Sequence, residues 1–127
     1  MKGSEDIESY LLRLDTPYEA IGEQMWNLHM QEDQNLVVSM ADTLVVFRLK
    51  VMDVPAVKRE VFYETLLQLN TTEMVHGAFG LENGAVVIVA ALALENLDFN
   101  EFQSTVDDIA LSVGKLYPKL SHFRDAA

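Results

Sequence analysis

Residues Val57 to Asn70 read VKREVFYETLLQLN, and the chain continues through two apolar segments, Met74 to Leu81 and Ala85 to Leu94, which Glu82-Asn83-Gly84 joins. In the first segment, apolar side chains recur at the spacing of one helix face, which predicts an amphipathic helix packed on a sheet. The residues on this face are Val57, Val61, Phe62, Thr65, Leu66 and Leu69. An Asn-Gly pair between apolar runs is the strongest short-range signal of a β-hairpin, so we expect the two later segments to pair as strands.

The strand expected from Ala85 to Leu94 is apolar on both of its faces. An antiparallel strand with one solvated face alternates apolar and polar residues instead. Either the chain itself covers both faces, or one face lies against a partner. We therefore expect a partner or dimer interface that includes Val87, Val89 and Ala91.

Trp26 and Met30 are further candidates for this interface. Both fall on one face of an alternating segment, Met25 to Met30, which predicts a strand. Tryptophan is enriched at binding hot spots, and methionine adapts to varied partners. Burial in the core is the alternative for both residues, and for Trp26 we favour an anchor of the sheet.

The remaining elements complete an order of helix, three strands, helix, two strands and helix. We expect a first helix to have Ser4 as its N-cap and to end near Asp15. An irregular stretch around Pro17 follows, with a short second helix as the alternative. A hairpin is then expected to join Leu36 to Met40 with Leu44 to Met52.

The last segment steps its apolar side chains by three and four residues after Asp98, which predicts a C-terminal helix with a heptad-like seam. Pro118 is expected to kink or end this helix near Tyr117. Runs of strands between helices favour an α+β fold with an antiparallel sheet flanked by helices, in the order α-β-β-β-α-β-β-α. At 127 residues, the chain suits a single domain, 1–127.

The chain is strongly acidic, with a formal net charge of −11. Such a charge repels the phosphate backbone of nucleic acids and favours an extended or basic protein segment as a partner. There is no cysteine, and the longest apolar run is far shorter than the ~20 residues that span a bilayer. We therefore expect a soluble, cytoplasmic protein with no nucleic-acid or membrane partner.

No motif in the sequence carries catalytic, metal-binding or cofactor-binding chemistry. The histidines, His29, His76 and His122, lie in different predicted elements without the spacing of a metal site. We expect His76 to be a hydrogen-bonded structural residue. The segment Gly77 to Gly80 lacks a phosphate-binding pattern. The sequence therefore predicts a protein that is not an enzyme, with no catalytic residue, metal or cofactor.

Three phrases of the sequence resemble a known family: Leu66-Leu67-Gln68-Leu69-Asn70, Gly77-Ala78-Phe79-Gly80-Leu81 and Leu97-Asp98-Phe99-Asn100-Glu101-Phe102. With the order of elements and the acidic charge, they make the chain similar to the YbjN-type proteins, described as bacterial sensory transduction regulators, within the superfamily of type III secretion chaperone-like folds. The resemblance covers essentially the whole chain. It implies a small α+β protein, commonly a homodimer in the secretion chaperones, in which the dimer binds an extended effector segment along apolar grooves and strand edges without a nucleotide.

Two functions are consistent with these observations. The first is a non-enzymatic protein-binding module, a chaperone-like protein or regulatory adaptor that acts as a homodimer through strand addition or apolar grooves. The alternative is a small-ligand sensor domain in signal transduction, with a pocket between the central helix and the sheet near Trp26, Phe47 and Phe62. The doubly apolar strand and the acidic surface favour the first function.

Overall fold

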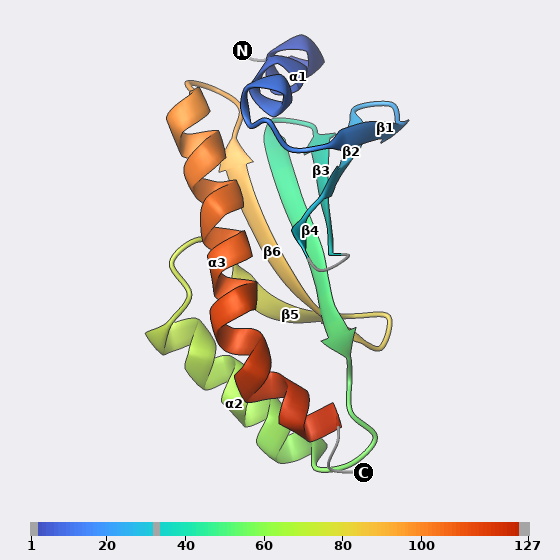
Figure 1. Ribbon diagram of the computed structural model, residues 1–127. Coiled ribbons are helices and arrows are strands. Elements are labelled where there is room, and N and C mark those ends of the chain that lie inside the picture. Colours follow the sequence, from blue (N-terminus) through green and yellow to red (C-terminus); the bar gives the residue numbers. More distant parts are fainter. Residues whose placement is uncertain (1–2, 32–33, 125–127) are drawn as a thin grey trace.

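The computed structural model describes residues 3–31 and 34–124, which form a six-stranded antiparallel sheet and three helices (Figure 1). The strands follow the order β1-β2-β3-β4-β6-β5 across the sheet. The predicted α+β fold with an antiparallel sheet flanked by helices is confirmed. In chain order the elements are α1 (Ser4–Arg13), β1 (Tyr18–Gly22), β2 (Met25–His29), β3 (Asn35–Ala41), β4 (Leu44–Asp53), α2 (Arg59–Thr72), β5 (Ala78–Glu82), β6 (Ala85–Ala93) and α3 (Phe99–Arg124).

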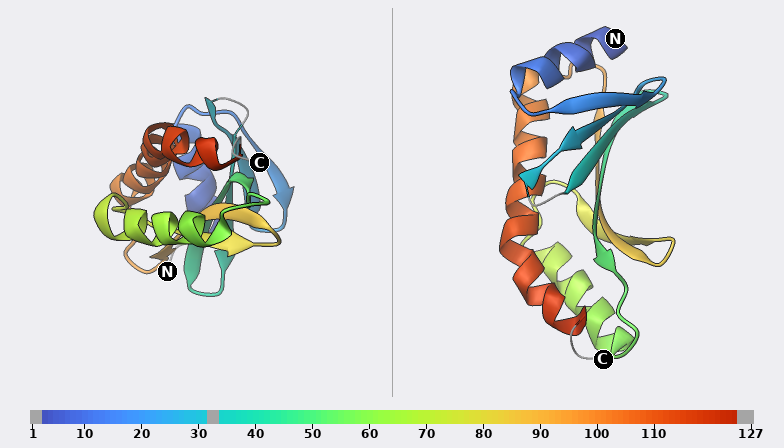
Figure 2. Two further views of the ribbon diagram at one scale, coloured as in Figure 1. Left: turned by 90° about the horizontal axis from the view of Figure 1, so that it is seen from below. Right: turned by 45° about the vertical axis from the view of Figure 1, so that its right-hand side comes forward.

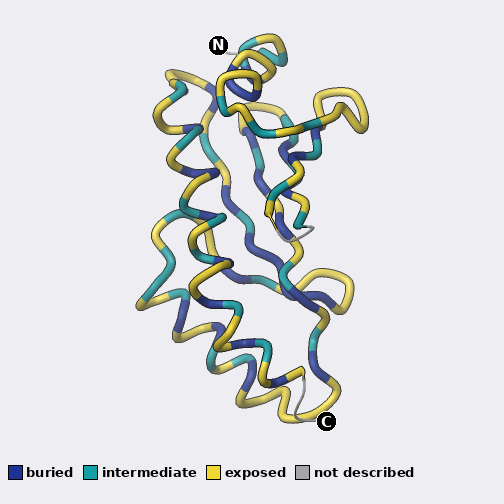
Figure 3. Tube along the Cα trace, in the orientation of Figure 1, coloured by how far each residue is buried: buried dark blue, intermediate teal, exposed yellow. Residues whose placement is uncertain are grey.

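The helices lie on one side of the sheet, which gives the sheet two unlike faces (Figure 2). α3 runs along the inner face, α1 lies across one end of the sheet, and α2 lies beside the C-terminal half of α3 at the other end (Figure 1). Buried residues follow β4, β6 and the side of α3 turned toward them (Figure 3). Among them, Phe47, Leu49, Ile88 and Ile109 are fully buried. The core therefore lies between α3 and the middle of the sheet.

Phe102 of α3 is the centre of an aromatic cluster that joins α1 to the sheet. Its ring centroid lies 5.4 Å from that of Phe47 on β4 and 5.5 Å from that of Tyr10 on α1. The Tyr10 hydroxyl donates a hydrogen bond of 3.1 Å to the carbonyl of Leu97, just before α3. A buried hydroxyl needs such a partner, so this bond fixes α1 against the start of α3.

α2 packs against the C-terminal part of α3 and the edge strand β5. The sequence instead predicts that α2 lies flat on the sheet. Its Phe62 meets Phe123 of α3 edge to face, with 5.1 Å between the ring centroids. Val57 and Val61 are 41% and 58% exposed, so the buried face of this segment is narrower than predicted. Helix periodicity identifies an apolar face, but it does not identify the element that covers it.

The N-terminal region departs from the prediction in two ways. β1 is an additional strand at the stretch that the sequence predicts to be irregular, so four strands and not three precede α2. Four of the five residues of β1 are exposed, and it therefore lacks the alternation that marks a half-buried strand. In α1, Gly3 is the N-cap in place of Ser4, and its N–H donates to the Asp6 carboxylate at 2.8 Å.

α3 continues through Pro118 to Arg124. Of the two predicted effects of Pro118, a kink or an end of the helix near Tyr117, the end is therefore wrong. Proline removes one hydrogen bond from a helix interior and disfavours its continuation. Beyond the proline, however, Leu120 and Phe123 are buried, and this apolar burial favours a continuous helix. In the part of the chain that the structure describes, no helix is long and apolar enough to cross a membrane.

Gly77 sets the path of the chain from α2 into β5. Its φ is +85°, and a Cβ on it would lie 2.6 Å from the backbone oxygen of Val89. We expect Gly77→Ala to lower the free energy of unfolding by at least about 2 kcal/mol, because both the φ and the contact are unfavourable for alanine. Urea unfolding followed by circular dichroism measures this change.

The control for this substitution is Gly114→Ala, since Gly114 lies in α3 with no atom within 4 Å of an added Cβ. This change should raise the free energy of unfolding by about 0.5–1 kcal/mol, the usual preference of a helix for alanine. Equal effects of the two substitutions would contradict the role given to Gly77.

Candidate protein-binding surface

The sheet face turned away from the helices carries apolar side chains that no helix covers. The strand register brings together Val37 of β3, Leu44 and Val46 of β4, and Val89 and Ala91 of β6. Ala91 is exposed, Leu44 is 40% exposed, and the three valines are half-buried. We call these five residues the outer face. The doubly apolar strand β6 thus keeps one face that the chain itself leaves partly open.

Val87 differs from the other predicted interface residues of β6, because side chains of this chain cover it. It is only 7% exposed. Arg48 on β4 and Glu82 on β5 form an ion pair of 3.1 Å, and the register places Val87 of β6 between them. The ion pair therefore passes over Val87. This covering removes Val87 from the accessible part of the predicted interface, whereas Val89 and Ala91 remain in it.

Trp26 lies in the core, and Met30 lies at the border of the core. Trp26 is 2% exposed and belongs to the same buried cluster as Leu28. It is therefore an anchor of the sheet and is not accessible to a partner. Met30 is half-buried against this cluster. The predicted interface residues thus do not share one surface. Val87, Val89 and Ala91 point to the outer side of the sheet, with Val87 covered, and Trp26 and Met30 lie on the inner side.

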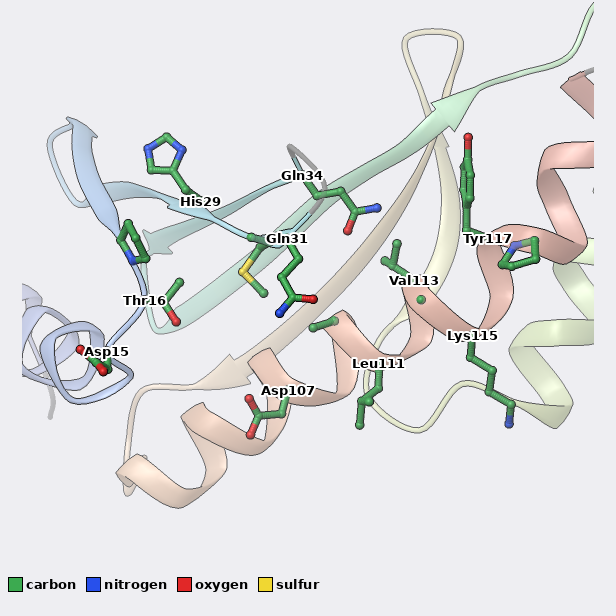
Figure 4. A pocket seen from close by; sticks show the side chains of 15 residues that line it. Asp15, Thr16, His29, Gln31, Gln34, Asp107, Leu111, Val113, Lys115 and Tyr117 are labelled. Atoms are coloured by element: carbon green, nitrogen blue, oxygen red, sulfur yellow. The ribbon is translucent and has the colours of Figure 1, made fainter.

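A groove of about 1020 Å³ lies between α3 and the region where β2 ends (Figure 4). The sheet side of this groove contains Met30, Gln31 and Gln34, and the helix side contains Val113 and Tyr117. Its walls mix apolar, aromatic and amide side chains. Because it is an open groove and not an enclosed cavity, it differs from the usual pocket of a small ligand.

The small-ligand pocket predicted near Trp26, Phe47 and Phe62 is not formed by these residues. All three side chains are at most 2% exposed and belong to the core. Phe47 packs on Phe102, and Phe62 packs on Phe123. These contacts fill the place of the predicted pocket, which counts against the sensor alternative.

His76 joins the connection between α2 and β5 to α3. Its Nδ1 atom contacts the carboxylate of Asp108, so His76 is hydrogen-bonded as predicted. Glu73 supports the same junction, since Lys115 and Lys119 of α3 lie 3.3 and 3.8 Å from its carboxylate oxygens. Within residues 3–31 and 34–124, no group of three or more His, Asp and Glu side chains is placed to hold a metal ion.

The edge of the sheet at β1 is open, a feature that the sequence did not predict. The Pro17 carbonyl accepts a hydrogen bond of 2.9 Å from the His29 N–H. Antiparallel pairs alternate between bonded and unbonded positions, so Tyr18 and Ala20 direct their N–H and C=O groups away from β2. β1 is the last strand on this side of the sheet, and no strand of the described chain pairs with these groups. The one available signal was Pro17, since proline within sheets is typical of edges and strand starts.

Comparison with known proteins identifies related sequences and folds. The sequence matches the CesT_Tir_1 family over residues 1–126. No curated protein matches it significantly.

Several solved structures share the fold. A chain of the heterodimeric ExoU–SpcU complex, from the type III secretion system of Pseudomonas aeruginosa, is 17% identical with a TM-score of 0.71, covering 88% of this chain and 95% of its own. YbjN from E. coli is 14% identical with a TM-score of 0.70, covering 93% of each chain. A chain of the complex between the Yersinia pestis type III secretion chaperone SycH and a stable fragment of YscM2 is 10% identical with a TM-score of 0.66, covering 89% of this chain and 98% of its own.

The family match spans nearly the whole sequence and agrees with the resemblance seen in it, so this chain belongs to the CesT_Tir_1 family of type III secretion chaperones.

Proposed function

We propose that this protein is a non-enzymatic, chaperone-like binding module that acts as a homodimer in the cytoplasm and captures an extended segment of another protein. The observation that carries the proposal is the one-sided sheet, in which the helices lie on the inner face while no other element of the described chain covers the outer face or the β1 edge. Extended segments add to open sheet edges through main-chain hydrogen bonds. The ExoU–SpcU and SycH–YscM2 structures, which share the fold, are complexes between two proteins.

The captured segment is expected to be extended and basic or neutral. The β1 edge lies among acidic side chains, with Asp15 before the strand, Glu19 within it and Glu23 after it. The net charge of −11 acts in the same direction. A positively charged segment would associate faster with this acidic surface. The same negative charge of the protein repels acidic partners, including nucleic acids.

The dimer is proposed to form through the outer face. Val89 and Ala91 lie on β6, a central strand that β4 and β5 hold on both sides. A second copy would remove these side chains and the neighbouring Val37, Val46 and Leu44 from water. Burial of apolar area is the main favourable term in such association. The strand register places Arg48 between Val37 and Val89, so the Arg48–Glu82 ion pair divides Val37 from the β6 part of this surface.

Substitution of Val89 or Ala91 by aspartate tests the dimer. Ala91→Asp places a carboxylate opposite Val46, where desolvation of the charge should weaken association by about tenfold or more. Val89→Asp places one opposite Arg48, so its effect should be in the same direction but smaller. Leu111→Asp is the control, because Leu111 is a 70% exposed apolar residue of α3, away from the outer face. Val87→Asp is unsuitable as a test, because Val87 is buried under the Arg48–Glu82 ion pair and a carboxylate there would destabilise the fold itself.

Size-exclusion chromatography with light scattering over a concentration series measures this effect. Leu111→Asp should leave the mass of the unmodified dimer unchanged. A dimer that survives both Val89→Asp and Ala91→Asp would require an interface elsewhere on the molecule.

Ala20→Pro tests capture at the β1 edge. Proline removes the outward N–H of Ala20 but no hydrogen bond to β2, and edge strands tolerate it. Ala20→Val is the control, since it keeps the N–H and favours a strand. Tagged chains are incubated with an extract of the native host, washed with salt and analysed by mass spectrometry. A partner held by the unmodified chain and by Ala20→Val should be lost with Ala20→Pro, and equal capture by all three would exclude strand addition at β1.

A further inference from the structure

The two edges of the sheet differ in whether their outward backbone groups have a hydrogen-bond partner. β1 and β5 are the outermost strands of the described sheet. An edge strand presents unpaired N–H and C=O groups that can pair with another chain. At β1 these groups, on Tyr18 and Ala20, have no strand beside them. At β5 the same alternation turns the groups of Phe79 and Leu81 outward, and those of Phe79 are already occupied by a side chain of α2.

That side chain is Asn70, in the last turn of α2. Its Oδ1 atom accepts a hydrogen bond of 2.7 Å from the Phe79 N–H, and its Nδ2 atom donates one of 3.2 Å to the Phe79 carbonyl. A carboxamide carries the same donor and acceptor as a peptide group. Asn70 therefore occupies the place that the backbone of a neighbouring strand would take.

The position of Asn70 is fixed by its surroundings. Its neighbour Leu69 is buried, which anchors this turn of α2 to the core. Gly77, with a φ of +85°, brings the chain back so that β5 starts one residue later beside the same turn. Asparagine is a poor residue for a helix interior compared with leucine or glutamine. Its contact with Phe79 provides a specific reason for its presence there.

We propose that Asn70 blocks the β5 edge at Phe79 and thereby directs strand addition to the β1 edge. The proposal rests on the proposed function in that it takes β1 as the docking edge. Without this closure, the open β5 edge of one copy would fit the open β1 edge of a second copy. Such a contact is heterologous and can repeat without closing, so it would build chains of molecules. Asn70 thus decides which edge a partner can use and prevents self-addition.

Asn70→Ala tests this role in the purified protein, with the chain itself as the probe. The variant should show a mass that rises with concentration to at least twice that of the unmodified chain in light scattering. The Phe79 amide should exchange its hydrogen about tenfold faster or more, because its bond to Asn70 is lost. Gln68→Ala is the control, since this amide of α2 bonds only Glu64, at 3.4 Å, on its own helix.

Two further variants separate edge closure from a merely structural role. Asn70→Asp keeps an acceptor for the Phe79 N–H, so it should keep the exchange of that amide slow while Asn70→Ala does not. Ala20→Pro in the Asn70→Ala background should abolish the self-association, because it blocks the edge to which β5 would add. In all variants the amide of Leu66, in the middle of α2, should keep its exchange rate, which shows that α2 stays folded.

Asn70→Ala with the unmodified mass and slow exchange at Phe79 would overturn the proposal. Faster exchange at both Phe79 and Leu66 without self-association would also overturn it, since Asn70 would then only stabilise α2. Self-association that persists with Ala20→Pro would exclude β1 as the edge that pairs. These readouts use purified protein and no captured partner, so their failure is distinguishable from a failure of the proposed function.

Discussion

The contact on which the rest of this structure depends is the burial of one apolar stripe of α3 against β4 and β6. Phe102, Ile109 and Leu116 of α3 are almost fully buried in it. The same helix receives α1 through Tyr10 and α2 through Phe62. Because every helix is held through this one stripe, all of them lie on one side, and the sheet is left with an uncovered face. The proposed dimer surface is thus a consequence of how the core is built.

Much of this architecture could be predicted from the sequence, because the relevant signals are local. Asn83 and Gly84 both adopt positive φ between Glu82 and Ala85, as the Asn-Gly hairpin signal requires. The spacing of apolar residues after Asp98 likewise predicted the buried side of α3. Both features depend on residues that are neighbours in the chain, so the sequence contains the necessary information.

The features that could not be predicted depend on residues that are distant in the chain. Val87 is covered by an ion pair between Arg48 and Glu82, which only the strand order brings together. β1 has no buried pattern because it lies at the edge, and the open groups of Ala20 become visible only once its register with β2 is known. The candidate surface was therefore predicted in part: Val89 and Ala91 were identified, whereas Trp26 is in the core.

The family and the chemistry of the site agree on a binding role and differ in what they specify. The match over residues 1–126 identifies a family of secretion chaperones, but it does not identify the surface that this chain uses. The geometry adds candidates for that surface, since one face and one edge of the described sheet are uncovered, while Asn70 occupies the Phe79 groups of the other edge. Specificity in such a module comes as much from surfaces that are closed as from those that are open.

The ion pair between Arg48 and Glu82 affects how firmly the edge strand β5 is held in the sheet. It links β4 to β5, two strands that share no backbone hydrogen bond because β6 lies between them. β5 is thus held by backbone hydrogen bonds to β6, by the ion pair to β4 and by the hydrogen bonds of the Asn70 carboxamide. An edge strand that is held only by its neighbour frays one residue at a time. β5, in contrast, must also break its contacts with Asn70 and Arg48 to leave the sheet, which raises the free energy of its local opening. The half-exposed ion pair contributes at most about 1 kcal/mol of this.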